Sequence, residues 1–424
     1  MRDILVTVVL LGLVPFSLRR PIFAASVYIA ISIGSVYRLA FGFASDQPWA
    51  MLYVAILLVA LFFSKDHSVW SGVVRWLPFF PFLLWVTLST IVALDTAIAL
   101  DRYLEFIKIQ IGLMLVFAAI RTLKDLILIY FVYVASISFH GVKSALFFIM
   151  SNSAVSIHGP PASVIADNNY FSVALVSCIP LLIYFASRVR SSFLSSVSWG
   201  LAGANGLTAL ATMSRGGMLA LSATVLFILI GSKKRIKIFI IVLPMLYLVL
   251  NALPQEFYDR MSTIERYDED MSVKGRFDAW ETASNVAKIR VTGAGFEFYK
   301  NAEVWARFSP EGSVARAAHS IYFQLLGDHG VIGLLFYLGA IAWVILHSTL
   351  RLSASSSAFY RDFVDLKRAG LLSILSILIG GASLSFAYWE GFLLLIGLIS
   401  CLRFVYDSNY NNLSKVVDNR FTTP

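Results

Sequence analysis

The sequence predicts an all-α polytopic membrane protein with about 12 transmembrane helices and one large polar loop. Of its 424 residues, 58% are hydrophobic and 14% are charged, and the mean hydropathy is +0.77. Soluble domains are closer to about 45–50% apolar and about 25% charged. Several apolar runs reach the roughly 20 residues that a helix needs to cross a bilayer. Because a backbone in lipid must satisfy its own hydrogen bonds, we expect these runs to be helices.

The apolar runs predict 12 or 13 spans, and no internal repeat relates them. In chain order they are 4–18, 21–39, 48–64, 77–94, 103–120, 126–150, 169–186, 197–213, 212–231, 237–253, 330–350, 369–385 and 389–406. The first run is interrupted by Pro15 and followed by Arg19 and Arg20, without a small-residue cleavage site. We therefore expect a retained membrane segment. Because the run 4–18 is short enough to be a half-helix, the side of the N-terminus stays open.

The basic residues lie mainly in short connections between apolar runs, which is the positive-inside pattern. They include Arg19/Arg20, Lys65 with Arg75, Arg121 with Lys124, Arg188 with Arg190, Lys233/Lys234/Arg235/Lys237, and Arg351 with Arg361/Lys367/Arg368. The formal charge of +9 is therefore explained by cytoplasmic anchors, and no nucleic-acid partner is expected. Four segments are left on the other side of the membrane, and we name them the outer segments: 95–102, 151–168, 214–217 and 254–318.

This pattern divides the chain into an N-terminal transmembrane bundle (1–253), a large outer loop (254–318), C-terminal transmembrane helices (319–406) and a cytoplasmic tail (407–424). The loop holds nine basic and eleven acidic residues and many aromatic ones, so it escapes the charge rule for short loops. A loop of this composition can fold over the bundle as a cap. Connections this long are usually functional.

Arg215 is the first candidate for binding an anion. The apolar run after it is too short to span unless it begins near Thr212, which places Arg215 in the first turn of a helix at the outer membrane face. There the guanidinium adds to the positive end of the helix dipole and to unpaired N–H groups. Gly216 and Gly217 would let a bulky head group approach the backbone. The alternative is an arginine that binds lipid phosphates.

Arg276 is the second candidate, within a predicted amphipathic helix of the loop. Its expected apolar stripe consists of Val273, Phe277, Trp280 and Ser284, with Arg276 beside it. The alternative is a local ion pair of Arg276 with a nearby acid such as Asp278 or Glu281.

His319 is the candidate base, at the point where the chain re-enters the membrane. A histidine has the right unperturbed pKa to accept a proton at neutral pH. Tyr322 and Phe323 would share a helical face with it, and Gly327, Gly330 and Gly333 predict a bend or close packing after it. The alternative is a hydrogen-bonded interfacial histidine. His329 is a second candidate in the same segment.

Further charged residues within apolar runs include Arg102 and Lys108, which could reach the same outer site or bind lipid phosphate. The sequence has no metal-binding pair of histidines, no Walker loop and no nucleophile elbow, so no metal or other cofactor is expected. Arginines are the available means of neutralising an anionic substrate.

The motifs around these residues resemble the O-antigen ligase and polymerase superfamily. The matching pieces are Ser214-Arg215-Gly216, Gly275-Arg276-Phe277 with Trp280, Gly293-Ala294-Gly295-Phe296, and His319-Ser320 with Gly330-Val331-Ile332-Gly333. The resemblance covers roughly residues 170 to 400. Family members often have His-Asn where this chain has His319-Ser320. The opening Met1–Val6 and Asp167-Asn168-Asn169 resemble a branch associated with exosortase gene clusters.

The resemblance implies a GT-C-like inverting glycosyltransferase of the bacterial inner membrane, acting at the periplasmic face. Its donor would be a glycan on undecaprenyl diphosphate, and a ligase would transfer it to a sugar hydroxyl of lipid A-core. Arg215 and Arg276 would clamp the diphosphate and His319 would remove the acceptor proton, with Trp280 and other loop aromatics available to stack on sugars. A polymerase or a protein O-oligosaccharyltransferase would use the same donor. A lipid-linked glycan transporter is the alternative from another class.

Overall fold

The computed structural model describes residues 1–424 except 41, 66–67, 152–156, 232–270, 350–357 and 422–424, and the described residues form helices and no strand. The helices are α1 (Arg2–Gly12), α2 (Val14–Arg19), α3 (Pro21–Ser32), α4 (Trp49–Phe63), α5 (Val69–Trp76), α6 (Phe80–Ile91), α7 (Thr96–Ala119), α8 (Leu123–Met150), α9 (Asn168–Arg188), α10 (Ser192–Ala211), α11 (Arg215–Ile230), α14 (Met271–Ile289), α15 (Ala302–Phe308), α16 (Ile321–Thr349), α17 (Ala358–Gly380) and α18 (Glu390–Phe421).

Each predicted apolar run within the described residues consists largely of helix, as expected for a helical membrane protein. Among the described residues, five segments are long and apolar enough to cross a membrane: Val69–Ile91, Leu123–Met150, Asn168–Arg188, Ile321–Ser348 and Glu390–Ser408. Shorter apolar helices are Pro21–Ser32, Trp49–Phe63 and Arg215–Ile230. The predicted span 237–253 lies outside the described residues, and the total of 12 or 13 spans stays a prediction.

Several runs differ from their predicted bounds, and α11 begins at Arg215 and not near Thr212, so it is shorter than the predicted span. The run predicted at 77–94 begins earlier, because α5, a short 3-10 turn at Leu77–Phe79 and α6 follow one another from Val69. The run predicted at 4–18 is divided at Leu13 into α1 and α2. Pro15 lies in the first turn of α2, where the missing N–H of a proline costs nothing.

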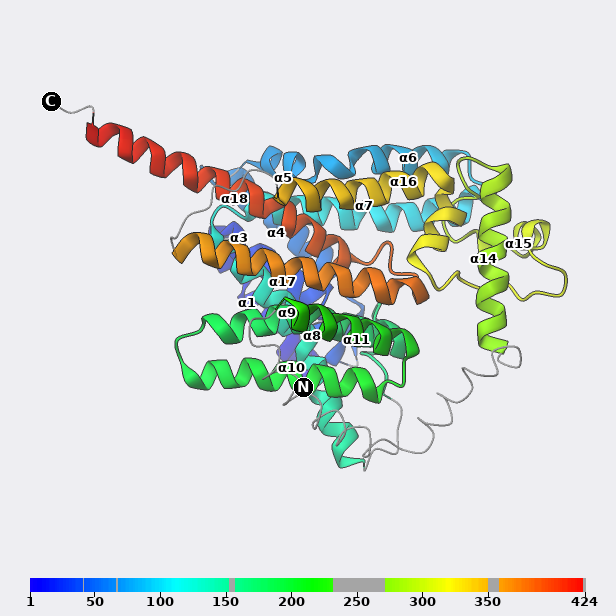
Figure 1. Ribbon diagram of the computed structural model, residues 1–424, viewed down its shortest axis with the longest axis horizontal. Coiled ribbons are helices and arrows are strands. Elements are labelled where there is room, and N and C mark those ends of the chain that lie inside the picture. The colour runs from blue at the N-terminus through cyan, green and yellow to red at the C-terminus, as the bar shows by residue number, and fades with distance from the viewer. Residues whose placement is uncertain (41, 66–67, 152–156, 232–270, 350–357, 422–424) are drawn as a thin grey trace.

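The long helices lie side by side, and α14 crosses one end of them together with α15 (Figure 1). We call this end, which carries residues 271–320, the loop end. Helices α9 and α18 are the most enclosed spans, since 78% of the apolar window of each is buried, against 28% for the α5–α6 segment. Helix α9, whose start carries Asp167 as N-cap, therefore lies in the packed interior.

The described basic connections lie at the end opposite the loop end. Arg188, at the end of α9, forms an ion pair with Asp362 of 2.8 Å and another with Asp365, both at the start of α17. Arg75 donates hydrogen bonds to the carbonyls of Phe117 and Ile120, where α7 ends. This separation of charge is what the positive-inside pattern predicts for the two ends of a membrane bundle.

The outer segments, as far as they are described, meet at the loop end. Asn301 donates a hydrogen bond to the Asp95 carboxylate at 2.7 Å, and the Leu94 amide donates to the Ala294 carbonyl at 3.0 Å. Asn168 donates to the Thr212 carbonyl at 2.9 Å. The four segments that the charge pattern placed together therefore also lie together in space.

The glycine-rich segment after α14 fastens the loop to a kink in α16. The amides of Ala294 and Gly295 donate to the carbonyls of Gly327 and Asp328 at 2.9 and 3.0 Å. Helix α16 is interrupted at Gly330, with φ 69° and ψ −174°. A Cβ at Gly293 would lie 2.5 Å from the Asp328 backbone. The glycines that predicted a bend or close packing provide both.

We expect Gly330→Ala to destabilise the protein, whereas Gly339→Ala in the same helix should not. The backbone of Gly330 occupies a region that is essentially restricted to glycine, and the new Cβ would lie 2.0 Å from the Val291 carbonyl oxygen. The strain alone is about 1–3 kcal/mol, so the Tm in detergent should fall by several degrees. No atom lies within 4 Å of a Cβ at Gly339. Equal Tm values for the two variants would contradict this account of the kink.

Candidate active site

Arg215 begins α11 at a corner that is hydrogen-bonded to the start of α9. Ser214, the N-cap of α11, accepts from the Gly217 amide at 3.0 Å and donates to the Asn169 side chain at 2.8 Å. Met213 just before it has φ 54°, which turns the chain sharply between α10 and α11. The half-buried Arg215 is thus held beside the start of α9, at the loop end where the sequence predicted it.

Gly216 and Gly217 do not leave room for a head group, and that expectation was wrong. A Cβ at Gly216 would lie 2.1 Å from the Ser383 hydroxyl, and one at Gly217 would lie 1.8 Å from the Ser172 hydroxyl. The space beside both residues is filled by neighbouring helices. These glycines allow α11 to pack against α9 and the 3-10 turn Gly381–Ser383.

The buried face of α14 differs from the predicted stripe. Gly275, Ala279, Ala283 and Val286 are buried, whereas 53% of Phe277 is exposed. Small side chains bring the helix close to the bundle, and the larger ones lie at the edges of the contact. The stripe was predicted from hydrophobicity alone. In the structure the small residues form the buried face, because they allow close packing.

Trp280 lies at the edge of α14 and holds the segment before α16. Its indole N–H donates to the Ala318 carbonyl at 2.7 Å, and its ring stacks on Phe323 at 4.9 Å between centroids. Both contacts flank His319. In this structure Trp280 therefore positions the histidine segment.

His319 lies half-buried between α14 and the start of α16, with φ 44°. Burial lowers the pKa of His319 below its usual value, the positive charge of Arg276 lowers it further, Asp167 opposes the shift, and Arg316 adds to it. Since a lowered pKa leaves the imidazole neutral at pH 7, His319 can accept a proton there.

The charged groups that act on His319 are Arg276 of α14, Arg316 before α16 and Asp167, the N-cap of α9, whereas Arg215 of α11 is not among them. The turn Gly381–Ser383 lies between the start of α11 and the segment of His319. It contacts Gly216 on one side and Ile321, two residues after His319, on the other. A basic site beside a neutral histidine can bind an anion and accept a proton from a neighbouring hydroxyl.

Arg102 and Lys108 both lie on α7. Arg102 forms ion pairs with Glu105 at 2.5 Å and with Glu297 at 3.9 Å, so it helps to fasten the loop to α7. Lys108 lies on the exposed face of the same helix. Neither is among the groups that influence the pKa of His319.

Tyr322 and His329 have packing roles in the structure. The Tyr322 hydroxyl donates to the Leu378 carbonyl of α17 at 3.0 Å. His329 is fully buried, its Nδ1 is 2.7 Å from the Ser89 hydroxyl, and its ring meets Phe296 at 4.5 Å between centroids. The structure thus distinguishes two histidines that the sequence offered together.

Two charged residues near His319 were not predicted as site residues. Asp167 attracted attention only as part of a polar triplet, although an acid directly before an apolar run at the outer face is itself a signal. Arg316 precedes His319 by three residues, and its guanidinium packs against Gly275. In the described part of the chain, no group of three or more His, Cys, Asp or Glu side chains is placed to hold a metal ion.

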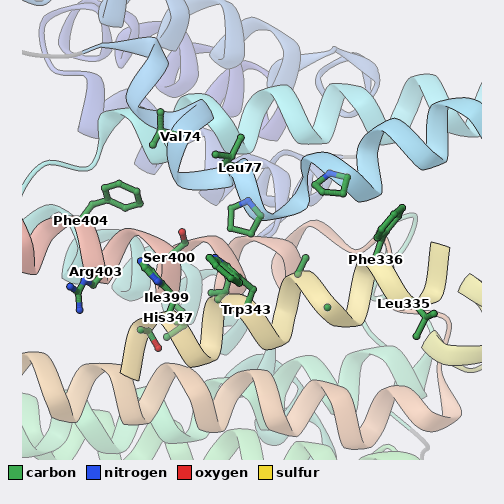
Figure 2. A pocket seen from close by; sticks show the side chains of 16 residues that line it. Val74, Leu77, Leu335, Phe336, Trp343, His347, Ile399, Ser400, Arg403 and Phe404 are labelled. Carbon is green, nitrogen blue, oxygen red and sulfur yellow. The ribbon is translucent and has the colours of Figure 1, made fainter. Parts of the chain in front are cut away.

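A separate groove of about 520 Å³ lies between α5, α6, α16 and α18 (Figure 2). Its lining is mostly apolar, with Leu77, Phe336 and Trp343 along it and Arg403 at one end. None of the predicted site residues lines it. The groove is therefore distinct from the site around His319.

The fold and the site define a helical membrane protein that carries a basic site and a histidine beneath a capping loop. Residues 200–338, which contain Arg215, Arg276 and His319, match the family model described as O-antigen ligase. This match supports the resemblance of the chain to the O-antigen ligase and polymerase superfamily. Residues 1–190 match a family of unknown function, and a search of curated proteins found no match. The family supports a glycosyltransferase-like activity of the ligase or polymerase type in a multi-pass membrane protein.

Proposed function

We propose that the protein is an O-antigen ligase, which transfers a glycan from undecaprenyl diphosphate to a sugar hydroxyl of lipid A-core. The observation that carries the proposal is the half-buried His319 beside Arg276, at the end of a bundle whose matching region is described as O-antigen ligase. In the proposed orientation the loop end faces the periplasm, because the described basic connections lie at the opposite end. A GT-C-like architecture of about 12 spans is part of the same proposal.

The proposed reaction is a single displacement at the anomeric carbon. The acceptor hydroxyl oxygen forms the new bond to this carbon, from the face opposite the diphosphate. The bond between the anomeric carbon and the phosphate oxygen breaks, and undecaprenyl diphosphate leaves with the electron pair. His319 takes the proton of the acceptor hydroxyl, and the configuration at the anomeric carbon is inverted.

The arginines would act on the leaving group. Negative charge grows on the diphosphate as its bond to the sugar breaks, and charge-assisted hydrogen bonds from guanidinium groups stabilise that charge. Arg276 on α14 and Arg215 at the start of α11 would reach the diphosphate from different elements. Their separate origins suit a two-phosphate group, which presents oxygens in several directions.

The proposal is tested by transfer in nanodiscs with purified protein, an undecaprenyl-diphosphate-linked glycan and EDTA. We expect lipid A-core to be converted to a larger product, seen as a gel shift, without an added metal. A parallel reaction without lipid A-core, and one with a protein acceptor, separate ligase from polymerase and from protein transferase. Formation of longer lipid-linked glycan, or of a modified protein, would show that the acceptor is a lipid-linked glycan or a protein and not lipid A-core. Unconsumed donor in every reaction would refute it.

A further inference from the structure

We propose that Arg316 is a third residue that binds the donor's diphosphate, and that Gly275 provides the space in which its guanidinium lies. This inference rests on the proposed function and adds a binding residue to it. Neither Arg316 nor Gly275 stood out as a binding residue in the sequence. Their relationship becomes visible only through the contact between α14 and the segment before α16.

The first observation is that the guanidinium of Arg316 packs against Gly275 of α14. A Cβ built on Gly275 would lie 2.1 Å from Nη1 of Arg316, 2.2 Å from Cζ and 2.6 Å from Nε. Every other residue type at position 275 would therefore displace the guanidinium. Because Arg276 is the next residue of the helix, this contact brings a second arginine close to the first.

The second observation is that no carboxylate of the described residues forms an ion pair with Arg316. Its Nε is buried without a hydrogen-bond partner. Burying a charged donor without an acceptor costs free energy. A ligand rich in anionic oxygens would supply the missing acceptors.

The third observation is the position of Arg316 relative to His319. The charge of Arg316 contributes to the low pKa of His319, so the two side chains share one electrostatic environment. A diphosphate bound by Arg316 would therefore lie beside the proposed base, where the sugar it carries must react. The forked donors of a guanidinium suit phosphate oxygens.

The test is binding of undecaprenyl diphosphate to the full-length protein in nanodiscs. Arg316→Ala should weaken binding by about 10- to 100-fold, as expected for lost hydrogen bonds to a charged group. Gly275→Ala should weaken it in the same direction, because the methyl group displaces the guanidinium. The double variant should bind no more weakly than Arg316→Ala, since both changes remove the same contact. Lys288→Ala, an exposed lysine of α14, is the control for loss of positive charge and should bind like the wild type.

Arg316→Lys keeps the charge and most of the volume, so it is the control for misfolding of Arg316→Ala. It should bind with intermediate affinity. In turnover, Arg316→Ala should raise the donor KM more than it lowers kcat. Wild-type binding with unchanged affinity in Arg316→Ala would overturn the inference and leave the proposed function intact. No binding by the wild type would overturn both. Additive effects of Gly275→Ala and Arg316→Ala would overturn the role of Gly275.

Discussion

His319→Asn is expected to abolish most glycan transfer, with a rate about 10²–10⁴-fold lower at neutral pH. The acceptor hydroxyl would then have no base positioned to take its proton. Asparagine is the informative replacement because residue 319 has φ 44°, a left-handed conformation that asparagine tolerates better than alanine does. The measurement is the initial rate of product formation with donor and acceptor at saturation.

The control for this experiment is His347→Ala, an exposed histidine near the opposite end of α16. It should keep the wild-type rate. Donor binding by His319→Asn should remain close to that of the wild type, since the imidazole acts on the acceptor. A variant with full activity would contradict the role of His319 as base. His329 would be a poor replacement, because it is fully buried among aromatic rings.

Arg276→Gln is expected to lower kcat/KM by about 10²–10³-fold, comparable to removing one group that stabilises developing negative charge. It should also change the pH profile. The positive charge of Arg276 holds the pKa of His319 down, and the base must be unprotonated to act. Activity of the wild type should therefore fall on acidification through a pKa below 6.5, and this fall should move to higher pH in Arg276→Gln.

The matched control is Arg307→Ala, an exposed arginine of the same loop, which should change neither the rate nor the profile. A profile of Arg276→Gln that coincides with that of the wild type would show that Arg276 does not act on the base. A rate unchanged at every pH would remove Arg276 from the diphosphate site. The two readouts therefore test the two roles separately.

The structure places the three main candidate residues at the loop end and adds Asp167 and Arg316, which were not predicted as site residues. Arg215, Arg276 and His319 lie at the end of the bundle where the charge pattern placed them, while their roles stay predictions. Arg102 is engaged with Glu105 and Glu297, and Tyr322 donates to α17. From sequence alone these residues could not be separated, because a charged or aromatic residue near the outer face looks the same whether it fastens the loop or faces a substrate.

The amino-acid sequence by itself determined the class of fold and the end of the molecule at which to look. The length of an apolar run and the position of basic residues are local properties, and a bilayer acts on them directly. Which side chains meet was decided only by the tertiary structure. Asp167, Gly275 and Arg316 come together through contacts between distant segments, and close packing assigns each glycine its neighbour. Gly216 packs against the hydroxyl of Ser383, whereas Gly275 packs against the guanidinium of Arg316. Only the surrounding structure distinguishes these two glycines.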